Sequence, residues 1–214
     1  IVATSIGVTV AGTSLIGNSI GEKNEKKTLN YFTHIIYYSI IISILITSIG
    51  LFLSKKVFIL MGTTDEVLSL GLQYTNIIFS GSILFILVVA MNSFLHAEGD
   101  TKTYRNVLIL SFLLNIVLNP ILIFGLFFFP ELGIKGIGVS TIVSQFVGFI
   151  IILLKLCKNK RIKQITKNLL IPRFKYFVNI FFQSMPIVIS ICAYSLTAAI
   201  IFKYIGQSGE YAVA

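Results

Sequence analysis

Uncharged polar side chains recur at regular intervals inside the most apolar part of this 214-residue chain. Ser111, Asn115 and Asn119 are spaced i, i+4 and i+8, so on a helix they share one face. Pro120 follows Asn119 and removes a backbone donor, which predicts a helix kink. Such a stripe either makes hydrogen bonds between helices or lines a path for a substrate or ion, and the sequence leaves both interpretations open.

A second polar set follows shortly after the first. Thr141, Ser144 and Gln145 lie at i, i+3 and i+4 and also share a helix face. The turn between the two helices, residues 130–138, is short, so the helices are expected to be antiparallel neighbours with Gln145 at the depth of Asn119. An unpaired amide in hydrocarbon costs several kcal/mol, so both stripes must face other helices or a water-filled cavity.

The elements that position these residues are six long apolar stretches with no Asp or Glu in any of them. They are 1–20, 31–53, 74–95, 107–129, 137–156 and 177–204. Mean hydropathy is +0.93, 56% of residues are hydrophobic and only 12% are charged. A bilayer core requires roughly 20 apolar residues per spanning helix. The sequence therefore predicts an all-α, polytopic transmembrane bundle with about six spans. We expect this bundle to be embedded in the lipid bilayer, which is its predicted partner.

The net charge of +9 is distributed unevenly between the gaps. Thirteen of the 17 Lys and Arg residues fall in the first, third and fifth gaps, and four fall elsewhere. The positive-inside rule places the thirteen on the cytoplasmic side, with the chain start outside and the connection 157–176 cytoplasmic. A plasma membrane location, in a prokaryote the inner membrane, fits this topology. The basic residues form no continuous helix or stripe, which argues against a nucleic-acid partner.

Other features set the organisation and exclude some chemistry. Residues 157–176 are the longest hydrophilic stretch and predict a basic linker between two bundles, and Pro186 predicts a kink in the last span. The chain opens inside an apolar stretch without an initiator Met, so we expect it to be an internal piece of a longer protein. Glu98 and Asp100 are too few ligands for a metal cage. Phosphate-loop, dinucleotide and intramembrane acidic motifs are lacking, so we expect neither an enzyme nor a cofactor.

Several motifs, each weak alone, occur in one order along the chain. They are Gly21-Glu-Lys-Asn, Leu60-Met-Gly-Thr-Thr-Asp-Glu-Val with Gln73-Tyr74, Glu98-Gly-Asp-Thr-Lys, Asn115-Ile-Val-Leu-Asn-Pro-Ile-Leu-Ile-Phe-Gly, and Leu132-Gly-Ile-Lys-Gly-Ile-Gly-Val-Ser-Thr. In these motifs, in their order and in the spacing of its hydrophobic stretches, the chain resembles the multidrug and toxic compound extrusion (MATE) transporters.

This resemblance implies a twelve-helix protein of two six-helix lobes, in which the chain would supply helices two to seven. Residues 1–156 would form an incomplete first lobe of five helices, 157–176 the cytoplasmic linker, and 177–214 the first helix of the second lobe. Family members are secondary antiporters that export organic cations and other amphipathic compounds in exchange for sodium or protons by alternating access. The full-length transporter is expected to be monomeric.

The resemblance also implies a first-lobe cation site, and here the sequence departs from it. Asn115 and Thr141 match an Asn and a Thr of that site, but Asn119 occupies the position of a carboxylate. An amide cannot carry a proton near neutral pH but can offer an oxygen to sodium. The expected cavity therefore consists of Asn115, Asn119 and Thr141, with Ser111, Ser144 and Gln145 beside them. A lipid-linked saccharide flippase of the same superfamily and a non-transporting membrane scaffold are the alternative functions.

Overall fold

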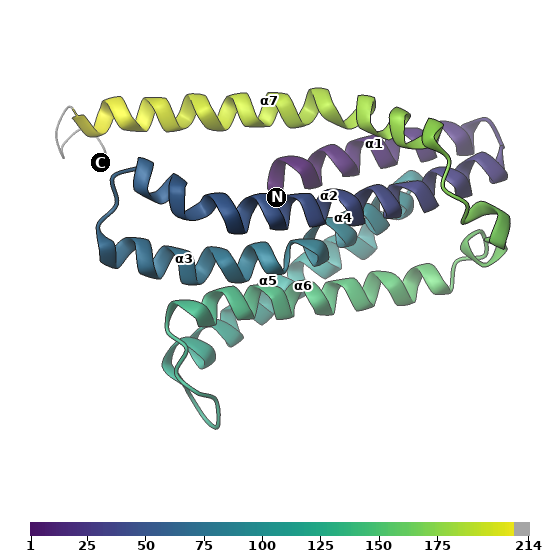
Figure 1. Cartoon of the computed structure of the whole chain (residues 1–214). Coiled ribbons are helices and arrows are strands. Elements are labelled where there is room, and N and C mark those ends of the chain that lie inside the picture. Colours follow the sequence, from purple (N-terminus) through teal and green to yellow (C-terminus); the bar gives the residue numbers. More distant parts are fainter. Residues whose placement is uncertain (208–214) are drawn as a thin grey trace.

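The computed structural model describes residues 1–207, and over that range it consists of helices joined by turns, without strands. Residues 208–214, the end of the predicted second-lobe segment, lie outside the described residues. The helices are α1 Val2–Gly21, α2 Glu25–Leu60, α3 Asp65–Ser80, α4 Ser82–Ala97, α5 Lys102–Phe124, α6 Ile134–Cys157 and α7 Phe174–Gln207, with two short 3-10 turns at Ile162–Gln164 and Lys167–Leu169 (Figure 1).

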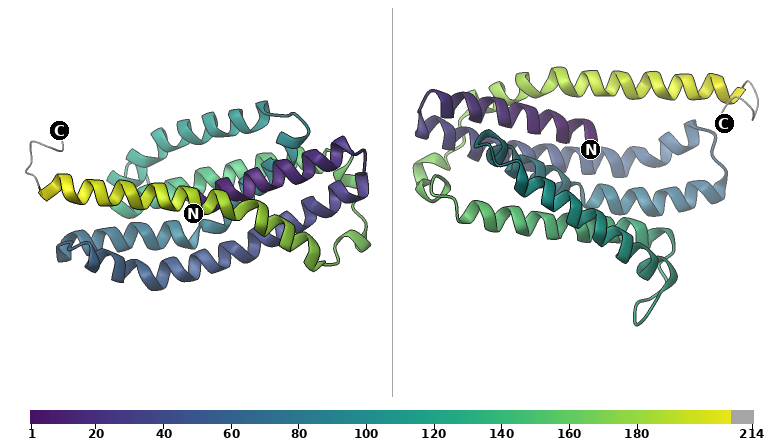
Figure 2. Two further views of the ribbon diagram at one scale, coloured as in Figure 1. Left: turned by 90° about the horizontal axis from the view of Figure 1, so that it is seen from above. Right: turned by 180° about the vertical axis from the view of Figure 1, so that it is seen from behind.

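The bundle is built around α1, α2 and α4. Most helices run along one direction, and α5 crosses α6 obliquely (Figure 2). The apolar core lies where α1, α2 and α4 meet, and it includes the fully buried residues Ile16, Ile35 and Phe94. The ring of Phe94 lies 4.9 Å from that of Phe32, centroid to centroid. Large side chains therefore fill this part of the bundle.

The number of spans differs from the sequence expectation. Four helices, α2, α5, α6 and α7, are long and apolar enough to cross a membrane, and the bent pair α3–α4 would be a fifth. The stretch 1–20 does form a helix, α1, but α1 is not among the candidate spans. The all-α polytopic bundle is confirmed, and by length and composition the described residues contain four to five candidate spans.

The third predicted span, 74–95, is not a single helix. It breaks at Gly81, where α3 and α4 meet at 42°. The hydroxyl of Thr47 on α2 lies at the break, 2.9 Å from the carbonyl oxygen of Phe79 and 2.7 Å from the hydroxyl of Ser82. A broken helix in a membrane requires such partners, because lipid offers none to the freed backbone groups.

The fourth predicted span, 107–129, also ends earlier than expected. Helix α5 stops at Phe124 because Gly125 adopts a left-handed conformation with φ of 64°. A Cβ atom at Gly125 would lie 2.7 Å from the backbone nitrogen of Glu131, so only glycine fits the turn there. Residues 125–133 then form the connection to α6.

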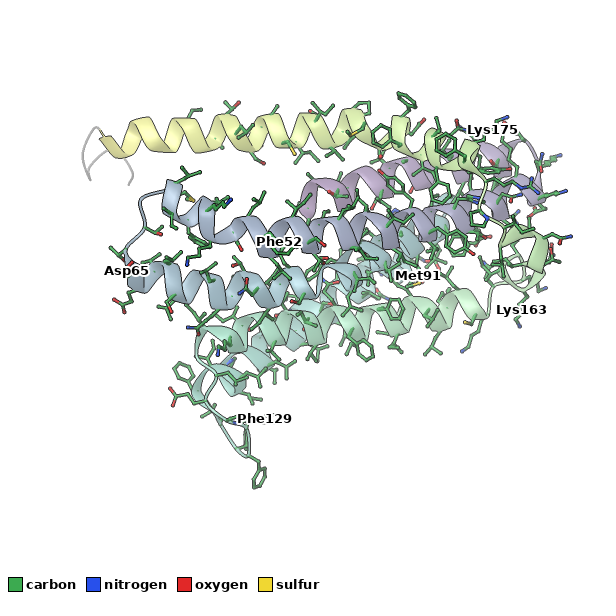
Figure 3. All side chains as sticks on the ribbon, viewed as in Figure 1. Phe52, Asp65, Met91, Phe129, Lys163 and Lys175 are labelled. Atoms are coloured by element: carbon green, nitrogen blue, oxygen red, sulfur yellow. The ribbon has the colours of Figure 1, made fainter. Side chains whose placement is uncertain are left out.

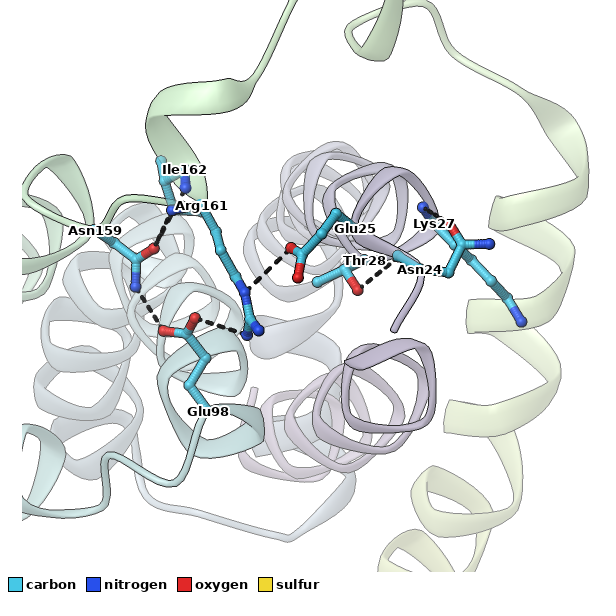
Figure 4. Close-up of polar contacts among 8 residues, drawn as sticks. All are labelled: Asn24, Glu25, Lys27, Thr28, Glu98, Asn159, Arg161 and Ile162. Carbon is cyan, nitrogen blue, oxygen red and sulfur yellow. Dashed lines mark hydrogen bonds and ion pairs between the residues drawn. The ribbon is translucent and has the colours of Figure 1, made fainter. Parts of the chain in front are cut away.

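Three connections meet at one end of the bundle (Figure 4). The guanidinium of Arg161, in the connection between α6 and α7, lies 3.1 Å from the carboxylate of Glu25 and 3.1 Å from that of Glu98. Glu25 opens α2, and Glu98 follows α4. These are the three gaps that carry most of the basic residues, so the prediction that they share one side is confirmed. Figure 3 shows Lys163 and Lys175 at this end and Asp65 at the other.

The connection between α6 and α7 is packed against the bundle. Helix α7 begins at Phe174, so the irregular part of the predicted linker is shorter than 157–176. The backbone N–H of Arg173 donates to Nε2 of His34 at 2.8 Å, and Nδ1 of His34 contacts the carbonyl oxygen of Asn30 at 2.7 Å. A fully buried side chain of α2 therefore holds the start of α7.

Candidate functional site

Helices α5 and α6 pack against each other through small residues. Gly136, Ser140, Ser144 and Gly148 recur every fourth residue on α6 and are all buried. A Cβ atom at Gly136 would lie 2.7 Å from the carbonyl carbon of Leu122 on α5. Small side chains thus let the two backbones approach closely, as is common between membrane helices.

The predicted polar residues of the two helices meet at this contact. The hydroxyl of Ser140 donates to Oδ1 of Asn119 in a short hydrogen bond and lies 3.4 Å from Oδ1 of Asn115. The hydroxyl of Thr141 lies 3.5 Å from the same Asn115 oxygen. We call these four residues, Asn115, Asn119, Ser140 and Thr141, the amide seam. The expectation that the two polar stripes face each other is confirmed.

Two further predicted residues extend the seam along the helices. The amide nitrogen of Asn115 donates to the carbonyl oxygen of Ser111 at 2.9 Å, and the Ser111 hydroxyl donates to the carbonyl oxygen of Ser144 at 3.4 Å. The Ser144 hydroxyl is buried and donates to the carbonyl oxygen of Ser140 at 2.9 Å. Gln145 is half-buried, and its side chain makes no hydrogen bond to the described residues. Gln145 is therefore the one predicted cavity residue outside the network.

The amide seam has more acceptors than hydroxyl hydrogens. The single hydrogen of the Ser140 hydroxyl faces Oδ1 of Asn115, Oδ1 of Asn119 and, at 2.9 Å, the carbonyl oxygen of Ile137. The Thr141 hydroxyl reaches the same carbonyl at 2.8 Å and competes for it. The two hydroxyl hydrogens of Ser140 and Thr141 are thus shared among three acceptor oxygens. Neither α5 nor α6 contains an Asp or Glu. The surplus of neutral oxygens suits a cation or an added donor.

Both predicted kink residues lie inside unbroken helices. Pro120 is within α5 and Pro186 within α7, and each helix continues through its proline. The hydroxyl of Ser184, two residues before Pro186, donates to the carbonyl oxygen of Phe181 at 3.1 Å. The kinks at these prolines stay predictions, whereas the 42° bend lies at Gly81.

Sequence reasoning missed two polar residues that the structure places in the bundle. Ser140 joins both amides of the seam, and its spacing of four residues from Gly136 and from Ser144 was the signal that could have found it. Asn92 on α4 is fully buried, and neither its amide nitrogen nor its oxygen has a hydrogen-bond partner among the described residues. Its position within the apolar stretch 74–95 was the available signal.

The carboxylates near the basic end are engaged in structural contacts. Glu98 pairs with Arg161, and Asp100 lies 3.1 Å from the ammonium of Lys155. Burial raises the pKa of Asp100, but hydrogen bonds from Thr103 and the charge of Lys155 outweigh it and lower the pKa to about 2. Among the described residues that were searched, no three His, Cys, Asp or Glu side chains are grouped so that they could hold a metal ion.

Comparison with known proteins gives one consistent family. The MatE family profile matches residues 1–121. The chain is 28% identical over 219 residues to the probable multidrug resistance protein YoeA of Bacillus subtilis, covering 100% of this chain and 47% of that protein. It is 32% identical over 174 residues to the probable multidrug resistance protein NorM of Thermotoga maritima, covering 81% and 36%.

A solved structure of MATE in the bent conformation has a TM-score of 0.87 to this chain. The two are 26% identical, and the match covers 99% of this chain and 47% of that one. The chain thus spans less than half the length of the relatives it matches.

Proposed function

The chain belongs to the MatE family, and we propose that it is part of a monomeric secondary antiporter of the plasma membrane that exports organic cations and other amphipathic compounds in exchange for sodium or protons. The names of the relatives in Bacillus subtilis and Thermotoga maritima, both probable multidrug resistance proteins, support export of several compounds. The basic end of the bundle would face the cytoplasm.

The observation that carries this proposal is the surplus of oxygen acceptors in the amide seam. Oδ1 of Asn115 and Oδ1 of Asn119 converge on one hydroxyl of Ser140, between two helices apolar enough to span a membrane. Hard cations bind through oxygen ligands. Because the Asn119 amide does not titrate near neutral pH, we assign the seam to sodium and not to a transported proton.

Cation binding at the seam would favour one conformation over another. In the structure, the Ser140 hydroxyl donates to Asn119, so a cation that takes the amide oxygens must turn this hydroxyl away. A ligand shifts a conformational equilibrium only by its difference in affinity for the two states. The state in which the hydroxyl has turned away would bind the cation better, and this difference would couple the cation to rocking of the lobes in alternating access.

The test uses the full-length transporter that contains this chain. We expect Asn119→Leu to abolish dye efflux driven by a sodium gradient in inverted vesicles while leaving the amount of inserted protein unchanged. The matched control is Val117→Leu on the same helix, whose side chain is exposed on the outer face of the bundle and should keep full efflux. Unchanged efflux in Asn119→Leu would remove the seam from the mechanism.

A second variant tests the assignment of the cation. Asn119→Asp introduces the carboxylate that the family pattern has at this position. We expect it to retain sodium-driven efflux and to gain efflux driven by a proton gradient, because a carboxylate takes up a proton and an amide does not. Proton-driven efflux of equal rate in the unaltered protein and in Asn119→Asp would contradict the assignment of sodium to the seam. Failure of the unaltered protein to export any dye would favour a scaffold role.

A further inference from the structure

The basic end of the bundle contains a pocket of about 250 Å³ between the start of α2 and the start of α7. Four basic residues and two tyrosines line most of it: Lys26, Lys27, Arg173, Lys175, Tyr31 and Tyr176. Figure 3 shows Lys175 at this end of the bundle. The pocket is separate from the amide seam, which lies between α5 and α6.

The charge around this pocket is largely uncompensated. Lys27 forms an ion pair with Glu22 at 2.7 Å. The described residues offer no ion pair to Lys26, Arg173 or Lys175, and no Asp or Glu is among the residues that line the pocket. The pocket therefore suits an anion.

The tyrosines add a rigid wall and a hydrogen-bond donor. The rings of Tyr31 and Tyr176 meet edge to face with their centroids 4.8 Å apart. The Tyr31 hydroxyl accepts a hydrogen bond from the amide of Asn179 at 2.9 Å, which leaves its own hydrogen available to an anion. The guanidinium of Arg173 can donate two parallel hydrogen bonds to a phosphate.

A separate apolar groove lies farther along the same two helices. Its volume is about 470 Å³, and its lining includes Tyr38 and Ile41 of α2 and Phe177 and Phe181 of α7. Tyr38 lies two turns beyond Tyr31 on α2, so the groove is farther from the basic end than the pocket. A charged pocket followed by an apolar groove matches a molecule with an anionic head and a hydrocarbon tail.

We propose that this pocket and groove bind an anionic phospholipid, with its phosphate among the basic side chains and one acyl chain along the groove. The pocket lies where the apolar parts of α2 and α7 begin, which is the level of lipid headgroups. The basic side chains supply the attraction, and the tyrosines suit the membrane interface. The site depends on the membrane location of the chain and not on the exported compound or the coupling ion.

The experiment measures lipid affinity in the full-length transporter purified in detergent. The melting temperature is followed as dioleoylphosphatidylglycerol is titrated into the micelles, with dioleoylphosphatidylcholine and inorganic phosphate as separate probes. The test variant is Arg173→Gln with Lys175→Gln. The matched control is Lys160→Gln with Lys163→Gln, which removes the same charge from exposed positions outside the pocket. Equal melting temperatures of both variants without added lipid would show that each is folded.

We expect phosphatidylglycerol to raise the melting temperature and phosphatidylcholine to raise it far less. Each basic side chain near the surface contributes about fivefold in affinity, so the test variant should bind phosphatidylglycerol about thirtyfold more weakly than the unaltered protein, and the control at most fivefold more weakly. If both variants bound phosphatidylglycerol equally weakly, the proposal would be overturned, because the lipid would then be attracted by the overall positive charge and not by this pocket. Stabilisation by inorganic phosphate equal to that by phosphatidylglycerol would also overturn it, since the groove would then contribute nothing.

Discussion

The small-residue contact between α5 and α6 predicts a large effect for a single methyl group. In Gly136→Ala, the new Cβ would lie 2.7 Å from the carbonyl carbon of Leu122, 2.8 Å from its oxygen and 2.9 Å from the nitrogen of Ile123. All three are backbone atoms, so no side chain can turn aside and the helices must separate. Overpacking of this kind costs typically about 1–3 kcal/mol. Separation would also stretch the hydrogen bond between Ser140 and Asn119, four residues along α6.

Gly17→Ala is the matched control, because it adds the same methyl group to a helix where no atom lies within 4 Å. Alanine is preferred over glycine in helices by about 1 kcal/mol, so this variant should be neutral or stabilised. Both glycines lie inside helices, so this preference applies to both variants, and the difference between them is expected to be the overpacking cost of about 1–3 kcal/mol. The assay is thermal unfolding of the full-length transporter in detergent. A melting temperature of Gly136→Ala equal to or above that of Gly17→Ala would refute the close contact of α5 and α6.

Three other changes test separate parts of the structure by thermal unfolding. Thr47→Val keeps the side-chain shape but leaves the Phe79 carbonyl at the helix break without its hydroxyl donor. We expect the free energy of unfolding to fall by about 1–3 kcal/mol. An unchanged free energy would mean that the hydroxyl does not stabilise the break. Asn92→Leu removes a buried amide without partners and should raise the melting temperature; a marked fall would reveal a partner for this amide. Asp100→Asn should destabilise the protein at neutral pH, because the folded-state pKa of Asp100, about 2, is below its ordinary value of 3.8. The stability that the Asp100 carboxylate contributes is present above about pH 4 and is lost as the pH falls through 2. The melting temperatures of the unaltered protein and of Asp100→Asn should therefore converge at low pH. A difference in melting temperature that does not change with pH would argue against the contact with Lys155.

The polar stripes show how far periodicity alone reaches. Spacing of four residues placed Ser111, Asn115 and Asn119 on one helix face, and the short connection placed that face against α6. Both inferences rest on helix geometry, and hydrogen bonds across the contact confirm them. The expectation that Gln145 lies at the depth of Asn119 is wrong: Asn119 meets Ser140 and Ser111 meets Ser144, so Gln145 lies near the level of Ser111. Periodicity gives the direction of a side chain and not the register between two helices.

The ends and breaks of the helices were less accessible from the sequence. The run 74–95 is apolar throughout its centre, and the bend at Gly81 depends on Thr47, which is distant in the sequence. Similarly, α5 stops at Gly125 because the backbone of Glu131 returns to fill the space beside it. Hydropathy reports how apolar a segment is, whereas these two features depend on tertiary contacts.

The two packing modes in the bundle suggest which element responds to a bound cation. Helices α1, α2 and α4 are joined by large buried side chains such as Ile35 and Phe94. Among the described residues, α5 makes its extensive contacts with α6 alone, through small residues and the amide seam, and only Val107 and Leu122 of α5 are buried. A ligand that changes the Ser140 hydrogen bonds thus acts on a contact between two helices, and the large-residue core need not be repacked. If the seam binds a cation as proposed, we therefore expect α5 to move relative to α6 while α1, α2 and α4 keep their mutual arrangement.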